Sequence, residues 1–239
     1  MRDRNALFNS ELLKELAPFT ISGYDLFREV IETDGALPAK LKGLFAAVVA
    51  CNRRYPALAR KELDRAARLG LTRNEAAAGL ILLSSLRGEG AALAFDATIR
   101  EIYPPACDGN ASPPRHPSSR QPELVRAAPG EAEANFKAYF GTVPPALATL
   151  LRLAPKGADG YFLMRKGTID CNQLDRKAAE LMLIAVLASD YSPQAATHIR
   201  AARAVGATDE EMAEAILCAV PSAGIAAWMA TGVLLEPQQ

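Results

Sequence analysis

The chain has 239 residues, which is enough to bury a sizeable core in one large domain or in two small ones. Lysine plus arginine and aspartate plus glutamate number 27 each, so the formal net charge is zero and no broad basic surface for nucleic acid or anionic lipid is expected. Half of the residues are hydrophobic but only 6% are aromatic, which favours helices over sheets. We therefore predict an all-α fold without a nucleic-acid partner.

The first half of the chain contains a series of expected helices. The N-terminus begins with charged residues and no apolar segment follows them, so we expect no signal peptide and a cytoplasmic protein. Residues 10–31 read as an amphipathic helix and residues 41–50 as a more apolar one. Tyr55 and Pro56 mark the next helix start, because proline suits the first turn.

A helix stop and a helix start then follow directly on one another. Gly70 ends one helix, because glycine accepts the left-handed conformation of a C-terminal cap. Thr72 and Glu75 have the spacing of a capping box, in which each side chain accepts a hydrogen bond from the other residue's backbone N–H. Residues 76–86 supply the next helix, which is dense in apolar residues.

Residues 105–122 are rich in proline, serine, glycine and asparagine and have no apolar periodicity. This composition predicts a linker. It divides the chain into a first unit over residues 1–104 and a second unit over residues 123–239.

The second unit repeats the first when the sequence is shifted by 136 positions. Its expected helices cover residues 132–153, 177–188 and 212–220, with a helix start at Tyr191-Ser192-Pro193. The pairs that coincide in this register are Tyr55 with Tyr191, Gly70 with Gly206, Thr72 with Thr208, Glu75 with Glu211, and Gly88 with Gly224, and Lys40 meets the similar Arg176. Because glycine stops and capping residues coincide without a gap, the sequence predicts two copies of one helical unit.

Residues 215–235 carry no charged side chain and are long enough to span a membrane. Pro221, Ser222 and Gly224 interrupt this stretch, which favours two short buried helices joined by a tight break. We therefore expect no membrane partner.

The four cysteines, Cys51, Cys107, Cys171 and Cys218, are far apart in the sequence. They form no Cys-x-x-Cys pair and no set with zinc-ligand spacing. We expect reduced thiols, no metal site and no cofactor.

The second unit resembles the carboxymuconolactone decarboxylase family, which includes the alkylhydroperoxidase D-like proteins. The resemblance lies in DRKAAELMLI at residues 175–184, HIRAA at 198–202, VGAT at 205–208 and EEMAEA at 210–215. The first unit keeps the outline more loosely, in RAARLGLT at residues 65–72 and in Glu75. The resemblance implies an all-α fold of two tandem units related by a pseudo-two-fold axis, and an oligomeric ring in which a two-unit chain suits a trimer.

Peroxidase members of this family place a Cys-x-x-Cys pair before a histidine, and a glutamate on the preceding helix completes a proton relay. The resemblance matches the histidine to His198 and the glutamate to Glu180, with one residue fewer in the loop between them. The thiols are absent, because their positions fall at about Tyr191 and Gln194. In the first unit the counterparts of Glu180 and His198 are Leu44 and Glu62, and Cys51 has no partner thiol, so we disfavour a thiol peroxidase.

Glu180 and His198 are the strongest candidates for chemistry. Glu180 is the only charged residue between Lys177 and Asp190, on a helix that is apolar nearly all round, and a buried carboxylate needs a compensating partner. The structural alternative is that Arg176 or Lys177 and the helix dipole satisfy it. His198 could exchange protons near neutral pH, or could simply be a packed core residue.

Four further residues are candidates with structural alternatives. Tyr191, as a catalytic residue, and Tyr55, as a substrate-binding residue, could donate to a substrate oxygen or could anchor a helix start. Arg54 and Arg87 could bind a substrate carboxylate or could be solvated surface residues.

These residues lead to two hypotheses of different class. The first is a cofactor-free decarboxylase, lyase or isomerase that acts on a small organic acid or lactone, with His198 moving the proton and Glu180 orienting it. The second is a non-catalytic helical binding or assembly protein of the same family. Contact between Glu180 and His198 favours the first, and a wide separation favours the second.

Overall fold

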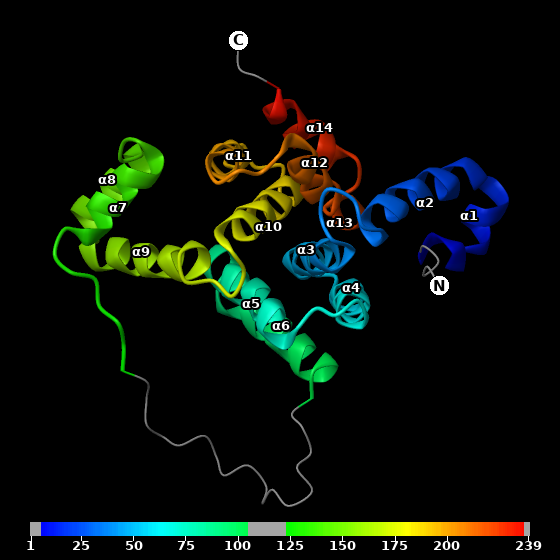
Figure 1. The fold of residues 1–239 in the computed structure, drawn as a ribbon, viewed down its shortest axis with the longest axis horizontal. Coiled ribbons are helices and arrows are strands. Elements are labelled where there is room, and N and C mark those ends of the chain that lie inside the picture. The colour runs from blue at the N-terminus through cyan, green and yellow to red at the C-terminus, as the bar shows by residue number, and fades with distance from the viewer. Residues whose placement is uncertain (1–5, 105–122, 237–239) are drawn as a thin grey trace, which may run out of the picture.

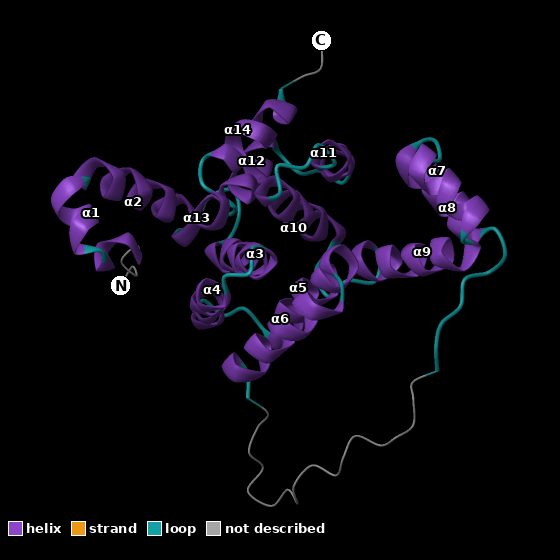
Figure 2. Ribbon diagram, turned by 180° about the vertical axis from the view of Figure 1, so that it is seen from behind, coloured by secondary structure: helices purple, strands orange, loops and turns teal. Residues whose placement is uncertain are grey.

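The structure of the protein is a computed structural model, which describes residues 6–104 and 123–236. The described residues form helices and loops without any strand, so the all-α prediction is confirmed (Figure 2). The predicted linker over residues 105–122 lies outside the described residues.

The first half consists of an N-terminal arm over residues 6–32 and of the four helices that follow it. In order these are η1 (Ala6–Asn9), α1 (Glu11–Leu16), α2 (Pro18–Glu32), α3 (Ala39–Asn52), α4 (Pro56–Arg68), α5 (Arg73–Arg87) and α6 (Glu89–Ile102). The expected helix over residues 10–31 is therefore broken at Ala17, because Pro18 cannot continue a helix but suits the first turn of the next one.

The second half has a similar order of helices. They are α7 (Glu131–Phe140), α8 (Pro145–Leu153), α9 (Pro155–Ile169), α10 (Arg176–Ser189), α11 (Ala195–Ala204), α12 (Asp209–Leu217), α13 (Val220–Ala223), α14 (Ala226–Thr231) and η2 (Gly232–Leu235). The uncharged stretch over residues 215–235 is thus split into short helices, as its proline and glycine predict. Within the described residues no helix is long and apolar enough to cross a membrane.

The predicted caps recur in both halves. Thr72 with Glu75, and Thr208 with Glu211, each form a complete capping box at the start of α5 and α12. The glycine that precedes each box has a left-handed backbone, with φ of 89° at Gly70 and 84° at Gly206. Because these bonds are local, they fix the same helix stop and start in each half.

Upstream of α4 and α11 the register differs from the expected 136 positions. Pro18 opens α2 and Pro155 opens α9, which is 137 positions later, and α3 and α10 are offset by the same 137. The offset changes from 137 to 136 at the start of α11, where the second half has one residue fewer than the first. There the Thr197 N–H donates to the Gln194 carbonyl, as in a tighter 3₁₀ turn.

This shift corrects three of the predicted pairings. Tyr55 corresponds to Ser192 rather than to Tyr191, since the Tyr55 N–H donates to the Ala50 carbonyl and the Ser192 N–H donates to the Leu187 carbonyl. Lys40 corresponds to Lys177 rather than to Arg176, since Lys40 bonds Glu75 at 2.7 Å and Lys177 bonds Glu211 at 2.6 Å. The counterpart of Glu180 becomes Gly43 rather than Leu44.

Each N-terminal arm packs on the opposite half of the chain. Helix α9 of the second half contacts α5 of the first near one end (Figure 1), and α2 of the first half contacts α12 of the second. Helices α3 and α10 contact one another at the centre, and most residues of α3 and nearly all residues of α10 are buried. The larger hydrophobic core draws on both halves, so the two form one packed body.

Candidate functional site

The centre of the candidate site is a contact between Glu180 on α10 and His198 on α11. The Glu180 Oε2 atom lies 2.8 Å from His198 Nδ1. Glu180 is fully buried, whereas His198 keeps a small exposed fraction. Lys177 pairs with Glu211 instead, and no ion pair between Arg176 and Glu180 occurs among the described residues.

Tyr139 on α7 completes this cluster, and the sequence analysis did not single it out. Its hydroxyl lies 3.1 Å from Glu180 Oε1 and 3.1 Å from His198 Nδ1. Burial, and then the neighbouring Glu180 carboxylate, raise the pKa of Tyr139 well above its usual value. Tyr139 therefore keeps its proton and serves as a hydrogen-bond donor.

These contacts set Nδ1, rather than Nε2, of His198 against Glu180. An ionised carboxylate can only accept hydrogen bonds, so with Glu180 ionised and His198 neutral the ring proton is on Nδ1. The Tyr139 hydroxyl then donates to the other carboxylate oxygen. The remaining ring nitrogen, Nε2, is left with a lone pair and is the atom of His198 available to a ligand.

His198 and Tyr139 line a pocket of about 340 Å³, and Glu180 lies behind them. The other lining residues are mostly apolar or aromatic: Leu86, Phe140, Pro144, Ala146, Leu147, Tyr161, Ile169, Leu183 and Leu187, with the more polar Ser85, Arg165, Thr168, Gln194 and Thr197. Ser85 and Leu86 belong to α5, so the first half supplies part of the wall around a site of the second half.

Arg165 on α9 is the charged residue of this pocket. Only 6% of its surface is exposed, and its guanidinium carbon lies 3.6 Å from the centre of the Tyr139 ring. Its Nη1 atom donates to Asn135 Oδ1 at 3.1 Å, while its buried Nε has no hydrogen-bond partner among the described residues. Burial lowers the pKa of Arg165, and its neighbours only partly oppose this shift. Arg165 is thus a buried cation that forms no ion pair within the described part of the chain.

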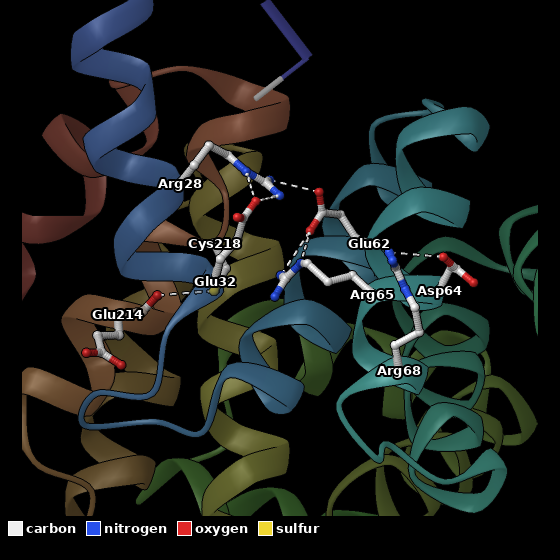
Figure 3. Close-up of polar contacts among 8 residues, drawn as sticks. All are labelled: Arg28, Glu32, Glu62, Asp64, Arg65, Arg68, Glu214 and Cys218. Carbon is white, nitrogen blue, oxygen red and sulfur yellow. Dashed lines mark hydrogen bonds and ion pairs between the residues drawn. The ribbon is translucent and has the colours of Figure 1, made fainter. Parts of the chain in front are cut away.

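The corresponding positions of the first half hold a closed ion-pair network (Figure 3). Arg28 stands 137 positions before Arg165, and its Nη1 atom lies 2.8 Å from Glu62, which stands 136 positions before His198. Glu62 also binds Arg65 at 3.0 Å, and Arg28 binds Glu32 at 2.7 Å through Nε. Burial alone would lower the pKa of Arg28, but Glu62 and Glu32 outweigh it and raise the pKa.

Gly43 explains how Arg65 fits into this network. A Cβ atom at Gly43 would lie 2.9 Å from Ala66 Cβ and 3.2 Å from Arg65 Nη2. The Arg65 guanidinium therefore lies next to the position from which Glu180 projects in the second half. A glutamate at position 43 would have to displace it.

The thiols are poorly placed for peroxide chemistry. Burial raises the pKa of Cys51 and raises the pKa of Cys218 to about 12, so both are protonated at neutral pH. Cys171 is exposed, all three of these cysteines are free, and Cys107 lies outside the described residues. Gln194, at the predicted position of the second thiol, lines the pocket.

The other predicted site residues lie outside this pocket. The Tyr191 hydroxyl donates to the Ala223 carbonyl at the end of α13, at 2.7 Å. Tyr55 is half exposed at the start of α4. Arg54 and Arg87 do line one pocket together, but it shares no lining residue with the pocket of His198.

Sequence reasoning missed Arg165 and Tyr139 for different reasons. Arg165 carries a signal, because Ala-Pro and Gly-Tyr precede it at the same distances as they precede Arg28, with Tyr161 matching Tyr24. These residues coincide when the sequence is shifted by 137 positions, but not when it is shifted by 136. Tyr139 has no counterpart among the described residues, and only the folding of α7 brings it to Glu180.

No group of three or more side chains suited to hold a metal ion occurs within residues 6–104 and 123–236.

Residues 155–234 match the model of the Carboxymuconolactone decarboxylase family. The match contains Arg165, Glu180 and His198 but neither α7 nor the first half of the chain. It confirms the predicted family likeness for the second half. No curated protein matches the chain.

Proposed function

We propose that this protein, whose residues 155–234 match the model of the Carboxymuconolactone decarboxylase family, is a cofactor-free enzyme that moves a proton on a small organic acid or lactone. The observation that carries the proposal is the 2.8 Å contact between Glu180 and His198 beside a pocket of about 340 Å³. The carboxylate holds the histidine in one tautomer and stabilises the imidazolium that forms when Nε2 takes up a proton.

Two reactions fit this arrangement. In an isomerisation, His198 Nε2 removes a proton from a carbon next to a carbonyl, and the resulting enolate receives it back at a different carbon. In a decarboxylation, the bond to the carboxylate breaks and carbon dioxide leaves. The electron pair stays on the substrate carbon, which takes the proton that His198 Nε2 has first accepted from solvent, and His198 returns to its neutral form.

Arg165 supports an anionic substrate. A buried guanidinium is costly without a negative partner, and a carboxylate matches its planar donor geometry. The first half offers a comparison, because Arg28 at the same repeat position already holds the carboxylate of Glu62 at 2.8 Å. We propose that a substrate carboxylate binds Arg165 next to His198.

Binding of a substrate carboxylate to Arg165 has different consequences for the two reactions. An ion pair with Arg165 stabilises the bound carboxylate and therefore opposes its loss as carbon dioxide. A decarboxylation substrate would need a second carboxylate, as 4-carboxymuconolactone has, whereas an acid with a single carboxylate would only exchange or shift a proton.

The test is to incubate the wild-type protein with 4-carboxymuconolactone and with unsaturated lactones that carry one carboxylate, in heavy water. Carbon dioxide release and deuterium incorporation are measured by mass spectrometry. We expect His198→Gln to lower kcat/KM by about 10²–10⁴-fold. Tyr191→Phe is the matched control, which should stay within about twofold because its hydroxyl binds a backbone carbonyl.

Equal turnover by wild type and His198→Gln would remove His198 from the mechanism. Binding of these acids without turnover or deuterium incorporation would favour the non-catalytic alternative of a binding or assembly protein.

We also expect a homo-oligomer, with a trimer as the first candidate from the family likeness. Exposed apolar side chains on α1 and α2 support a contact with another copy, since Phe19 is 91% exposed and Leu12, Leu16 and Leu26 are exposed beside it. Light scattering after size-exclusion chromatography tests this, and Phe19→Glu should lower the mass of the assembly.

A further inference from the structure

A second pocket, of about 620 Å³, lies where the two halves meet. Arg54, Arg87 and Asn52 come from the first half, and Asp190 comes from the end of α10 in the second half. The pocket shares no lining residue with the one that contains His198. It is therefore a separate candidate site.

The charged groups leave this second pocket with an excess of positive charge. Arg87 forms an ion pair with Asp190 and a hydrogen bond to Asn52, so the one lining carboxylate is already engaged. Burial, and then the nearby positive charge of Arg53, lower the pKa of Arg87. The Arg54 side chain has no ion-pair partner within residues 6–104 and 123–236.

The N-termini of two helices, α4 and α6, also lie at this pocket. Pro56 is the first residue of α4, and Gly90 and Ala91 lie in the first turn of α6, and all three line the pocket. Neither helix start receives a hydrogen bond from a capping side chain. The free N–H groups that follow Pro56 in α4, and those of the first turn of α6, add to the positive potential with the helix dipoles, and Glu89 in the first turn of α6 partly opposes it.

The opposite helix end nearby is satisfied by the backbone. The last carbonyl groups of α3 accept hydrogen bonds from the N–H groups of Arg53, Arg54 and Tyr55. They therefore offer little attraction to a cation.

We infer that this pocket between the halves binds a small oxyanion, a phosphate or carboxylate group held by Arg54 and Arg87 at the N-termini of α4 and α6. The site is distinct from the proposed catalytic pocket. The rest of the ligand would lie against the apolar wall formed by Pro56, Ala91 and Ala94.

The experiment is a calorimetric titration of the full chain at low ionic strength, with inorganic phosphate in one series and succinate in another. Arg54→Gln is the test variant, because its side chain forms no ion pair whose loss would disturb the described fold. Arg60→Gln is the matched control, since Arg60 lies on α4 outside the pocket and pairs with Glu101 at the surface at 2.8 Å. His198→Gln is measured as a second control.

We expect Arg54→Gln to weaken binding at least about tenfold, while Arg60→Gln and His198→Gln stay within about twofold of wild type. Tighter binding of phosphate would identify a phosphorylated ligand, and tighter binding of succinate a carboxylic acid. Absence of binding by wild type to both anions would overturn the inference. Equal weakening by Arg54→Gln and Arg60→Gln would overturn it too, because it would indicate non-specific attraction.

Discussion

The two halves of the chain place different side chains at the same positions of a similar helical framework. Arg28 and Arg165 stand 137 residues apart, and Glu62 and His198 stand 136 apart. In the first half the arginine binds a carboxylate of the chain itself, whereas Arg165 forms no ion pair within the described residues. The comparison shows that a similar helical framework can either pair a buried arginine with a carboxylate of the chain itself or leave that arginine open to the carboxylate of a ligand.

The opposite pKa directions of the two arginines express the same difference. Glu62 and Glu32 raise the pKa of Arg28, whereas burial lowers the pKa of Arg165. A ligand carboxylate at Arg165 would raise the pKa of that arginine, as Glu62 raises the pKa of Arg28 in the first half.

The largest effect is expected from replacing Glu62 and His198, which occupy corresponding positions in the two halves, by glutamine. Glu62→Gln leaves two buried arginines without their shared carboxylate and should lower the free energy of unfolding by about 3–5 kcal/mol. His198→Gln should lower it by only about 1 kcal/mol, although it should abolish most turnover. Urea denaturation of both variants measures the difference, and equal losses would contradict the view that only the first half is closed by ion pairs.

The arginine position gives the next largest contrast. Arg28→Met should destabilise the protein by about 3–5 kcal/mol, because it removes the buried arginine that pairs with both Glu32 and Glu62. Arg165→Met should change stability by about 1 kcal/mol or less, since losing the contact with Tyr139 is offset by removing a buried charge. The same variant should raise the KM for acidic substrates, and an unchanged KM would argue against the proposed anchor.

Tyr139 gives a smaller, pH-dependent effect. Its pKa in the folded state is raised above the unfolded value of 10.0, so the stability it contributes is present below about pH 10 and is lost as the pH rises further. The free energy of unfolding of the wild type should therefore fall more steeply above pH 10 than that of Tyr139→Phe, by up to about 1.4 kcal/mol per pH unit. Parallel curves for the two proteins would show that Tyr139 is not held protonated by its surroundings.

The smallest effect tests the corrected register. Lys40 bonds Glu75 and Lys177 bonds Glu211, and each pair is partly exposed. Lys40→Met and Lys177→Met should therefore each lower stability by about 0.3–1 kcal/mol and by similar amounts. Thermal unfolding monitored by circular dichroism would show this, with Arg176→Met as the control for the earlier pairing.

Local features of the fold could be predicted well from the sequence. The capping boxes at Thr72 and Thr208 and the left-handed glycines at Gly70 and Gly206 depend on hydrogen bonds between near neighbours, so the residues alone reveal them. The break at Pro18 and the separate helix α9 were missed, because an apolar periodicity continues across a helix boundary.

The site could be predicted only in part. The family likeness pointed to Glu180 and His198, and the structure places them in contact. Tyr139 comes from a helix 41 positions before Glu180, and no local pattern indicates that contact. The register error hid Arg165, because a single tightened turn in α11 separates an offset of 136 from one of 137.

The reciprocal packing of the arms makes neither half self-sufficient. Helix α5 carries Ser85 and Leu86 into the pocket beside His198, although no residue of α5 takes part in the proposed proton transfer. A fragment that began at residue 123 would keep Glu180 and His198 but would open the pocket to solvent on one side. The first half thus supplies a wall of the pocket beside His198 and is needed to keep that pocket closed on this side.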